Sequence, residues 1–405
     1  MGKRTQRSGR TVLEEQIWAR RMTLEEFVTY AEKFAREHGE PGTLSLRHLK
    51  RFVGGNPTGP PRPATQRLLE AIFGLPWERS LAHPTADQDL TGGAERLAVE
   101  LHNARQLDAE AVQLLASQVD TIRRLDRRLG AGALLGQLRD HATHVRQLLT
   151  YTVHDQTRRA LGFVLTDAYT LAGWQALDQG ETLASWNHYR DACEAARIAE
   201  SPTWLAHTQA EQSVVLADTG ETALAVELTE HAYESTRRSA PPLLRAWLAA
   251  AHGEALAAHA QHSASLRAFD QAATLMPASP LPEPGSPYMA LDDAHLARWR
   301  GHALARFGHP DAITVLNDAL TRHDPTFVRA ETGLRTDLTL AYLADGELDE
   351  ATRHCAQATV LADQVGSTRQ RRRLNSAHNR LSTNMSINSR QPVQSRPTLA
   401  PPETE

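Results

Sequence analysis

The sequence predicts an all-α protein in which a small helical head precedes a longer α-solenoid. Apolar residues recur at helical spacing along most of the 405 residues, and the alternation typical of strands is nearly absent. A short pattern of turn and small residues repeats at intervals of about 40 residues. Positive charge gathers at the N-terminal end, where residues 1–82 hold 14 Lys and Arg against 9 Asp and Glu. This excess of +5 leaves −9 for the remainder, because the whole chain carries −4.

Three amphipathic helices are expected in the head. Thr23 followed by Glu26 is a capping-box pattern, so the first helix is expected to begin there, in "MTLEEFVTYAEKFAREHG". Ser45 is a candidate N-cap for the second helix, "LRHLKRFV", which two glycines end. The third helix follows a proline-rich loop, in "ATQRLLEAIFG".

The second of these helices has an apolar side and a basic side without acids. Leu46, Leu49 and Val53 are expected to face the core, with Phe52 at its margin. The candidate DNA-binding residues are Ser45, Arg47, His48, Lys50 and Arg51. Arginine and lysine donors reach phosphate oxygens and guanine O6 and N7. The basic side therefore favours contact with duplex DNA, and the alternative is a solvated helix without a binding role.

Three other segments lack a helical pattern. Lys3, Arg4, Arg7 and Arg10 belong either to an arm that strengthens phosphate contact or to a disordered start. Residues 83–92 are polar and predict a linker. Residues 382–405 are rich in Pro and Ser and predict a disordered tail, because they cannot bury enough apolar surface to offset their ordering entropy.

Residues 93–381 predict a domain of repeated helical hairpins. The pattern is a turn residue, a small residue 5 positions later, on average a larger one at 9, and a small one at 12. It starts at Gly180, Gly220, Ala260 and Gly346, and a copy from Gly308 is one residue shorter. The three later positions share one face of the second helix, so the first helix can approach closely. Each hairpin leaves an apolar face for the next hairpin to cover, which builds a solenoid.

The first helices of successive hairpins are expected to line a concave groove. The residues that map to this surface are Asp167, Trp174, His207, Trp247, Glu254, Arg298 and His302. Indole rings beside charged groups suit a peptide, a small amphipathic molecule or a segment of a protein partner. Arg298 would receive a carboxylate. The alternative is an ordinary packed or solvated surface.

Other chemistry finds little support in the sequence. Neither of the two histidine pairs that share a helix face has a third metal ligand at suitable spacing. The stretch "GAGALLG" lacks the Gly-Lys-Ser/Thr ending of a phosphate loop, so no cofactor is predicted. No set of side chains at catalytic spacing indicates an enzyme. No apolar run approaches the roughly 18–20 residues of a membrane span, and two distant cysteines favour a reducing, cytoplasmic compartment.

Stretches in both parts of the chain resemble one family. The head from "MTLEEF" to "RPATQRLLEAIFGLPWE", followed by repeats that include "YMALDDAHLARWRGHALARFGHPDA", is similar to a group of actinobacterial transcription regulators. These regulators join an N-terminal helix-turn-helix of the Cro/repressor (XRE-like) type to C-terminal tetratricopeptide repeats. The resemblance covers most of residues 11–381. Heads of this type have a short second helix and a tight turn, whereas in this chain the second helix is long and "HGEPGT" makes a wide connection.

The resemblance implies that residues 1–82 bind duplex DNA and that the repeats sense a peptide, a small molecule or a protein partner. A shift between two conformations of the repeats would then change the spacing of two heads in a homodimer, and hence the affinity for DNA. The alternative is a tetratricopeptide interaction scaffold with a degenerate head that does not bind DNA. Salt-dependent DNA binding distinguishes the two hypotheses.

Overall fold

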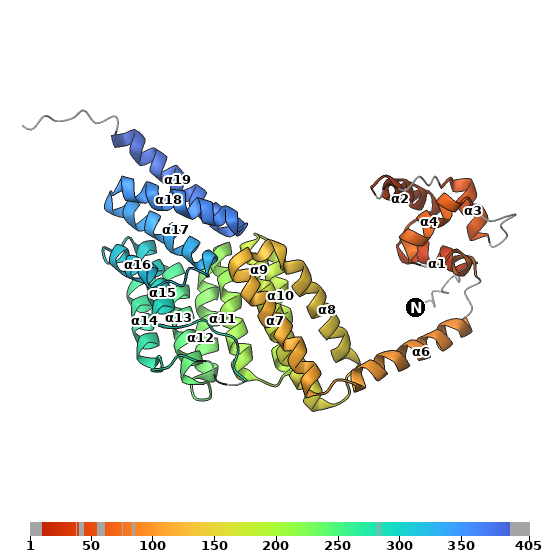
Figure 1. Ribbon diagram of the computed structural model, residues 1–405, viewed down its shortest axis with the longest axis horizontal. Coiled ribbons are helices and arrows are strands. Elements are labelled where there is room, and N and C mark those ends of the chain that lie inside the picture. The colour runs from red at the N-terminus through yellow and green to blue at the C-terminus, as the bar shows by residue number, and fades with distance from the viewer. Residues whose placement is uncertain are drawn as a thin grey trace, which may run out of the picture. The chain divides into compact units, whose positions relative to one another are not determined.

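The structure is all-α, as the sequence predicts. The computed structural model describes residues 10–37, 39, 44–54, 61–74, 76–82, 86–281, 283 and 285–388. Within these residues the ordered elements are α-helices and one short 3-10 helix, without a β-strand (Figure 1). The chain divides into two compact units, Met1–Glu100 and Leu101–Glu405.

The first unit contains five helices and most of a sixth. Their bounds are α1 Val12–Ala19, α2 Leu24–Glu37, α3 Leu46–Val53, α4 Pro63–Phe73 and α5 Trp77–Ser80. The expected capping box is present before α2, because the N–H of Thr23 donates to Glu26 Oε2 (2.7 Å) and the N–H of Glu26 donates to Thr23 Oγ1 (3.2 Å). One apolar core joins α1 to α5, with Phe27, Leu49 and Leu68 fully buried.

The buried side of α3 differs from the expected side. Phe52 is 2% exposed and packs edge-on against Trp77, with 4.8 Å between ring centroids, whereas Leu46 is only half-buried. The expectation that Phe52 lies at the margin and Leu46 in the core is therefore corrected. The physical reason is α5, which brings an indole to the side of α3 that carries Phe52.

The structure extends helices into two segments that the sequence predicts as linker and tail. Helix α6, Ala86–Arg105, covers most of the predicted linker, and α19, Thr368–Asn388, continues past residue 381. Apolar residues keep a spacing of three and four from Leu90 to Leu101, which supports helix despite Gly92 and Gly93. After residue 381 the next helix breaker is a proline at 392. Residues 1–9, with Lys3, Arg4 and Arg7, and residues 83–85 and 389–405 lie outside the described residues.

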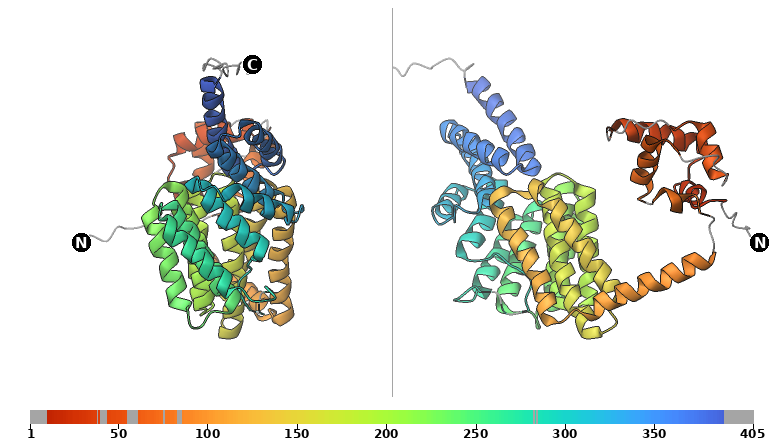
Figure 2. Two further views of the ribbon diagram at one scale, coloured as in Figure 1. Left: turned by 90° about the vertical axis from the view of Figure 1, so that its left-hand side faces the viewer. Right: turned by 45° about the vertical axis from the view of Figure 1, so that its right-hand side comes forward.

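The second unit is a solenoid of antiparallel helix pairs (Figures 1 and 2). The bounds are α7 Ala109–Leu129, η1 Ala131–Ala133, α8 Leu135–Tyr151, α9 Asp155–Asp178, α10 Thr182–Ile198, α11 Pro202–Thr219, α12 Thr222–Thr236, α13 Pro242–Ala258, α14 His262–Leu275, α15 Asp293–Phe307, α16 Ala312–Thr321, α17 Val328–Asp345 and α18 Leu348–Gln364, followed by α19. Each predicted turn residue stands between the two helices of one pair. The predicted repeat register is therefore the register of the fold.

The turn residues and the small residues occupy the conformations and positions that the repeat pattern requires. All five turn residues have positive φ, from 58° at Ala260 to 90° at Gly220. The four small residues five positions later are fully buried, and these are Ser185, Ala225, Ser265 and Ala351. Positive φ is disfavoured for residues with a Cβ, so glycine at four of the five turns reduces strain.

Two helix pairs show how the small residues allow close approach. The hydroxyl of Ser185 donates to the carbonyl of Gly173 (2.7 Å), and a Cβ on Gly173 would lie 2.8 Å from the ring of Tyr189. Ser265 donates in the same way to Gly253 (2.8 Å). The glycine and the small residue therefore let an inner helix lie against an aromatic ring of its partner, which stabilises each pair by dense packing.

Replacing Ala351 with phenylalanine is expected to overpack the α17–α18 pair. Ala351 is fully buried, so the larger ring must displace helix α17, at an expected loss of about 1–3 kcal/mol in the free energy of unfolding. Denaturant unfolding measures this loss. Val360→Phe on the same helix is the matched control, because Val360 is 67% exposed and its replacement should change stability by less than about 0.5 kcal/mol. Equal stability of Ala351→Phe and the parent protein would contradict the repeat register.

The last helices of the solenoid return to its first helices. Arg329 on α17 contacts Asp126 on α7 (2.5 Å) and Asp178 on α9 (3.3 Å). The hydroxyl of Ser367, just before α19, donates to Asp178 (2.6 Å). The backbones also meet, since a Cβ on Gly130 at the end of α7 would lie 1.9 Å from the carbonyl oxygen of Val365. We call the contacts of Arg329 and Ser367 with Asp126 and Asp178 the ring-closing contacts.

Candidate functional site

The inner helices of the second unit surround a cavity of about 400 Å³. The first helix of each pair contributes to its lining, and these helices are α7, α9, α11, α13, α15 and α17, together with α19. The ring-closing contacts bring α17 and α19 to α7 and α9, so the cavity has walls from both ends of the solenoid. Cavities of this volume hold drug-sized ligands.

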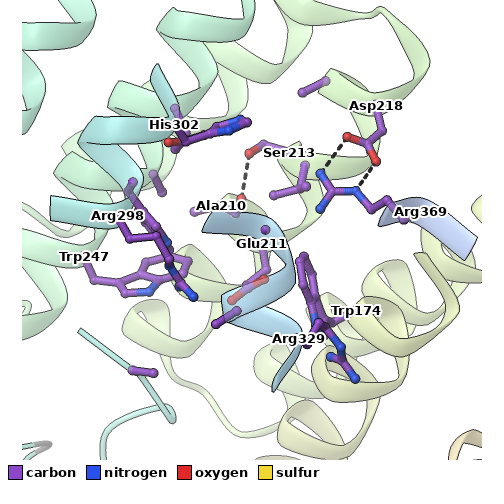
Figure 3. Close-up of a pocket in the computed structure, with 18 of the residues that line it drawn as sticks. Trp174, Ala210, Glu211, Ser213, Asp218, Trp247, Arg298, His302, Arg329 and Arg369 are labelled. Atoms are coloured by element: carbon purple, nitrogen blue, oxygen red, sulfur yellow. Dashed lines mark hydrogen bonds and ion pairs between the residues drawn. The ribbon is translucent and has the colours of Figure 1, made fainter. Parts of the chain in front are cut away.

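All seven residues that the sequence places in the groove line this one cavity. They are Asp167, Trp174, His207, Trp247, Glu254, Arg298 and His302. They come from α9, α11, α13 and α15, and Figure 3 shows Trp174, Trp247, Arg298 and His302 around it. The repeat register thus predicts which side chains share the inner surface, while binding of an effector there stays a prediction.

Most charged groups of the cavity neutralise one another. Asp167 accepts a hydrogen bond from Arg123. Both carboxylate oxygens of Asp218 accept from Arg369, at 2.5 and 2.9 Å (Figure 3). Asp337 accepts from Arg373 and lies 2.8 Å from His302 Nδ1. Burial opposes ionisation of Asp337, but His302 and Arg373 outweigh it and hold the pKa of this carboxyl well below its ordinary value.

Arg298 is different, because its guanidinium has no hydrogen bond or ion pair with any residue that the structure describes. Burial lowers the pKa of Arg298, while the fields of Asp337 and Glu254 act in the opposite direction. The side chain points into the cavity beside Trp247 (Figure 3). A guanidinium without a protein partner in such a site can hold a carboxylate or phosphate with two parallel hydrogen bonds.

Two carboxyl groups also lack a strong cationic partner. Glu211 Oε1 lies 4.0 Å from His207 Nε2, and the hydroxyl of Tyr189 approaches Glu211 Oε2 at 3.5 Å. Burial raises the pKa of Glu211 to about 7, although Tyr189 and Arg123 oppose the shift. Glu254 lies 3.6 Å from His302 Nε2, and burial raises the pKa of its carboxyl as well. These are the only lining carboxyl groups, among the described residues, without an arginine partner.

Aromatic rings form one wall of the cavity. His207 and Trp247 are in contact, with 4.4 Å between ring centroids, and Trp299 lies edge-on to Trp247 at 5.8 Å. Trp247 is 4% exposed, so most of its ring packs within the cavity wall and little of it faces the open cavity. Burial lowers the pKa of His207 to about 3, so this ring is neutral at physiological pH. Its Nε2 has no hydrogen-bond partner among the described residues.

Several lining residues were not predicted from the sequence. These are chiefly Glu211, Arg127, Tyr288, Trp299, Phe327 and the arginines of α17 and α19. The 40-residue spacing of the first three turn residues carries a signal for Glu211, because it aligns Glu211 with Leu171 and Ala251, which also line the cavity. Arg329 and Arg369 come from the ring closure, and no local pattern reveals such a distant contact.

Glu211→Gln is expected to stabilise the protein above pH 7 and to have little effect near pH 5. The pKa of Glu211 is raised in the folded state from 4.5 to about 7, so the stability that its proton contributes is complete below about pH 4.5 and is lost as the pH rises through 7. Glutamine keeps the neutral form at every pH. Because the side chain is 24% exposed, the gain at pH 8 should be on the order of 1–2 kcal/mol.

Melting curves at several pH values test this expectation, with Glu227→Gln as the control, because Glu227 is exposed on the outer helix α12. A constant difference between Glu211→Gln and the parent from pH 5 to pH 8 would contradict the raised pKa.

The second candidate site is the exposed side of α3 in the first unit. Ser45 caps α3 by accepting a hydrogen bond from the N–H of His48 (3.3 Å), as predicted. Arg47, His48, Lys50 and Arg51 are all exposed, and Arg51 lies over the ring of Phe52 at 5.5 Å. The acid-free side is not isolated from acids, however, since Lys50 pairs with Glu25 of α2 at 3.3 Å. This exposed pair contributes little stability.

Two further structural features concern metals and membranes. Among the described residues, no three His, Cys, Asp or Glu side chains gather closely enough to hold a metal ion. None of the helices in the described part of the chain combines the length and apolar character of a bilayer span.

Comparison with known proteins identifies no family for this chain. No protein-family model matches the sequence, and no curated protein matches it. Among solved structures, this chain is distantly similar to a Rap protein crystallised with Competence and Sporulation Factor. The two chains are 15% identical with a TM-score of 0.48, over 73% of this chain and 88% of that chain.

Proposed function

We propose that this protein is a transcription regulator whose first unit binds duplex DNA and whose second unit binds an effector in its cavity. The observation that carries the proposal is the pairing of two sites on one chain. One is the exposed basic side of α3, with Arg47 and Arg51 one helical turn apart. The other is a cavity in which Arg298 has no hydrogen-bond or ion-pair partner among the described residues. Arg47 and Arg51 would reach base edges and phosphates, and Arg298 would receive an anionic group.

The chain itself offers a route between the two sites. Helix α7 contributes Arg123, Asp126 and Arg127 to the cavity wall, and α6 directly precedes α7 in the chain. An effector that binds one arrangement of α7 and α17 more tightly changes the fraction of molecules in which the ring-closing contacts are formed. The shift would be transmitted through α6 to the DNA-binding unit and would change the affinity for DNA. In a homodimer, the separation of two heads would be the quantity that changes.

Selection of bound genomic fragments by the full-length protein tests the proposed function. We expect recovery of fragments that share a recurrent sequence, and binding that weakens steeply between low and physiological salt. Fragments without a shared sequence would remove sequence-specific regulation from the account. Absence of any retained DNA at low salt would contradict the regulator and favour the interaction scaffold with a degenerate head.

A further inference from the structure

Some charged groups of the cavity have no oppositely charged arginine or carboxylate partner within it, and these groups indicate a ligand that carries both a positive and a negative charge. Asp126, Asp167, Asp218 and Asp337 each have an arginine partner. Glu211 and Glu254 have no arginine partner. Among the described residues, three lining arginines likewise have no carboxylate partner. The cavity therefore offers unmatched groups of both signs, where a site for a simple anion would offer positive charge alone.

Arg298 is the best placed of the three unmatched arginines. Arg127 lies against the rings of Tyr288 (5.3 Å) and Phe327 (4.1 Å), which partly satisfy its charge. Arg306 is exposed to solvent. Among the described residues no aromatic ring lies over the charge of Arg298, and its partly buried side chain points into the cavity (Figure 3). Burial of an unmatched charge is unfavourable, so a ligand that neutralises Arg298 removes that penalty on binding.

Glu211 is the better placed of the two unmatched carboxyl groups. Glu254 Oε1 is inaccessible and its other oxygen faces His302, which leaves it little room for a ligand. Glu211 keeps 24% of its side chain exposed and points into the cavity near Trp174 (Figure 3). The groups that face it are Tyr189 of α10, Arg123 of α7 and His207 of its own helix. None of them forms an ion pair with it, because His207 is neutral and Arg123 is engaged by Asp120 and Asp167.

We propose that the effector is a zwitterion, with an amine that binds Glu211, a carboxylate that binds Arg298 and an apolar segment between them. This inference rests on the proposed function, since it names the ligand class of the same cavity. The wall between the two poles supports the apolar segment, because Ala210, Val214, Ala251 and Ala255 line it together with Trp247.

The arrangement of the helices sets the length of the ligand. Glu211 lies on α11 and Arg298 on α15, with α13 packed between them. Neighbouring helices pack about 8–10 Å apart, so the two axes are separated by roughly 16–20 Å, and the two side chains shorten the gap to the order of 10 Å. An extended chain advances about 3.3–3.6 Å per residue, so a tripeptide-sized molecule spans this gap.

Binding of three matched tripeptides to the full-length protein tests the proposal. The probes are Leu-Leu-Leu with both ends free, its N-acetyl derivative and its C-terminal amide, measured by calorimetry near neutral pH. We expect the free peptide to bind, and loss of either charge to weaken binding roughly ten- to hundredfold. In Glu211→Gln the free and the N-acetylated peptide should bind with equal affinity, because the amine has lost its partner. In Arg298→Met the free peptide and the C-terminal amide should bind with equal affinity, because the carboxylate has lost its partner. The melting temperature of each variant shows that it is folded.

The outcomes separate this inference from the proposed function. Equal binding of the acetylated and free peptides would overturn the amine site while leaving the cavity as an effector site. A loss on acetylation that persists in Glu211→Gln would place the amine elsewhere and overturn the assignment to Glu211. No binding of any of the three peptides at millimolar concentration would overturn the zwitterion, and recovery of sequence-specific DNA would still support the regulator.

Discussion

Replacing Arg329 with methionine is expected to lower the free energy of unfolding of the second unit by about 3–5 kcal/mol. The Arg329 side chain is 10% exposed, and its partners Asp126 and Asp178 are 5% and 1% exposed. Methionine fills much of the same volume but leaves two buried carboxylates without their cation. Removing one member of a buried ion pair is costly, because the remaining charge keeps its desolvation penalty.

Denaturant unfolding followed by circular dichroism measures this effect. Arg322→Met is the matched control, because Arg322 pairs with Asp318 on the exposed side of one helix and should contribute less than about 1 kcal/mol. The same experiment distinguishes ring closure from local stability. If Arg329→Met and the parent protein have the same free energy of unfolding, the contact between α17 and the helices α7 and α9 does not hold the solenoid closed.

Replacing both Arg47 and Arg51 with alanine is expected to abolish specific DNA binding. Each arginine that makes a bidentate contact to a base contributes about 1–3 kcal/mol, so the two together should weaken binding by roughly 2–6 kcal/mol. Both side chains are exposed, and the core residues of α3 are Leu49, Phe52 and Val53. The substitutions should therefore leave the helical content and the melting temperature unchanged.

Fluorescence anisotropy with a selected genomic fragment, at one fixed salt concentration, measures the loss. Arg36→Ala is the control, because Arg36 is an exposed arginine of the same unit that lies on α2. A double variant that binds the fragment as tightly as the parent would remove α3 from the interface. An equal loss in Arg36→Ala would indicate an effect of net charge without a specific role for α3.

The repeat domain could be predicted in detail from the sequence because its determinants are local. A turn residue with positive φ and small residues at two helical positions recur within each hairpin, so one register explains Ser185, Ala225, Ser265 and Ala351 together. Helical geometry then assigns the inner surface. All seven predicted cavity residues follow from that assignment, since they lie on the inner face of successive first helices.

The remaining features depend on contacts between distant segments. Arg329 and Asp126 are 203 residues apart, and Ser367 and Asp178 are 189 apart, so no periodic pattern relates them. The burial of Phe52 likewise depends on Trp77 in another helix. The free charge of Arg298 is also a property of the fold, because the sequence cannot show that Asp337 is already engaged by Arg373 and His302.

We propose that binding in the cavity and binding of DNA by the first unit are energetically coupled. The direct test of this coupling is the affinity of the full-length protein for a selected genomic fragment, with and without a ligand that stabilises the protein thermally. We predict that a saturating ligand changes the dissociation constant for DNA by about 5- to 150-fold, and that DNA changes the affinity for the ligand by the same factor. In Arg298→Met the ligand should leave the affinity for DNA unchanged. A ligand that binds in the cavity of the parent protein without altering its affinity for DNA would contradict the claim.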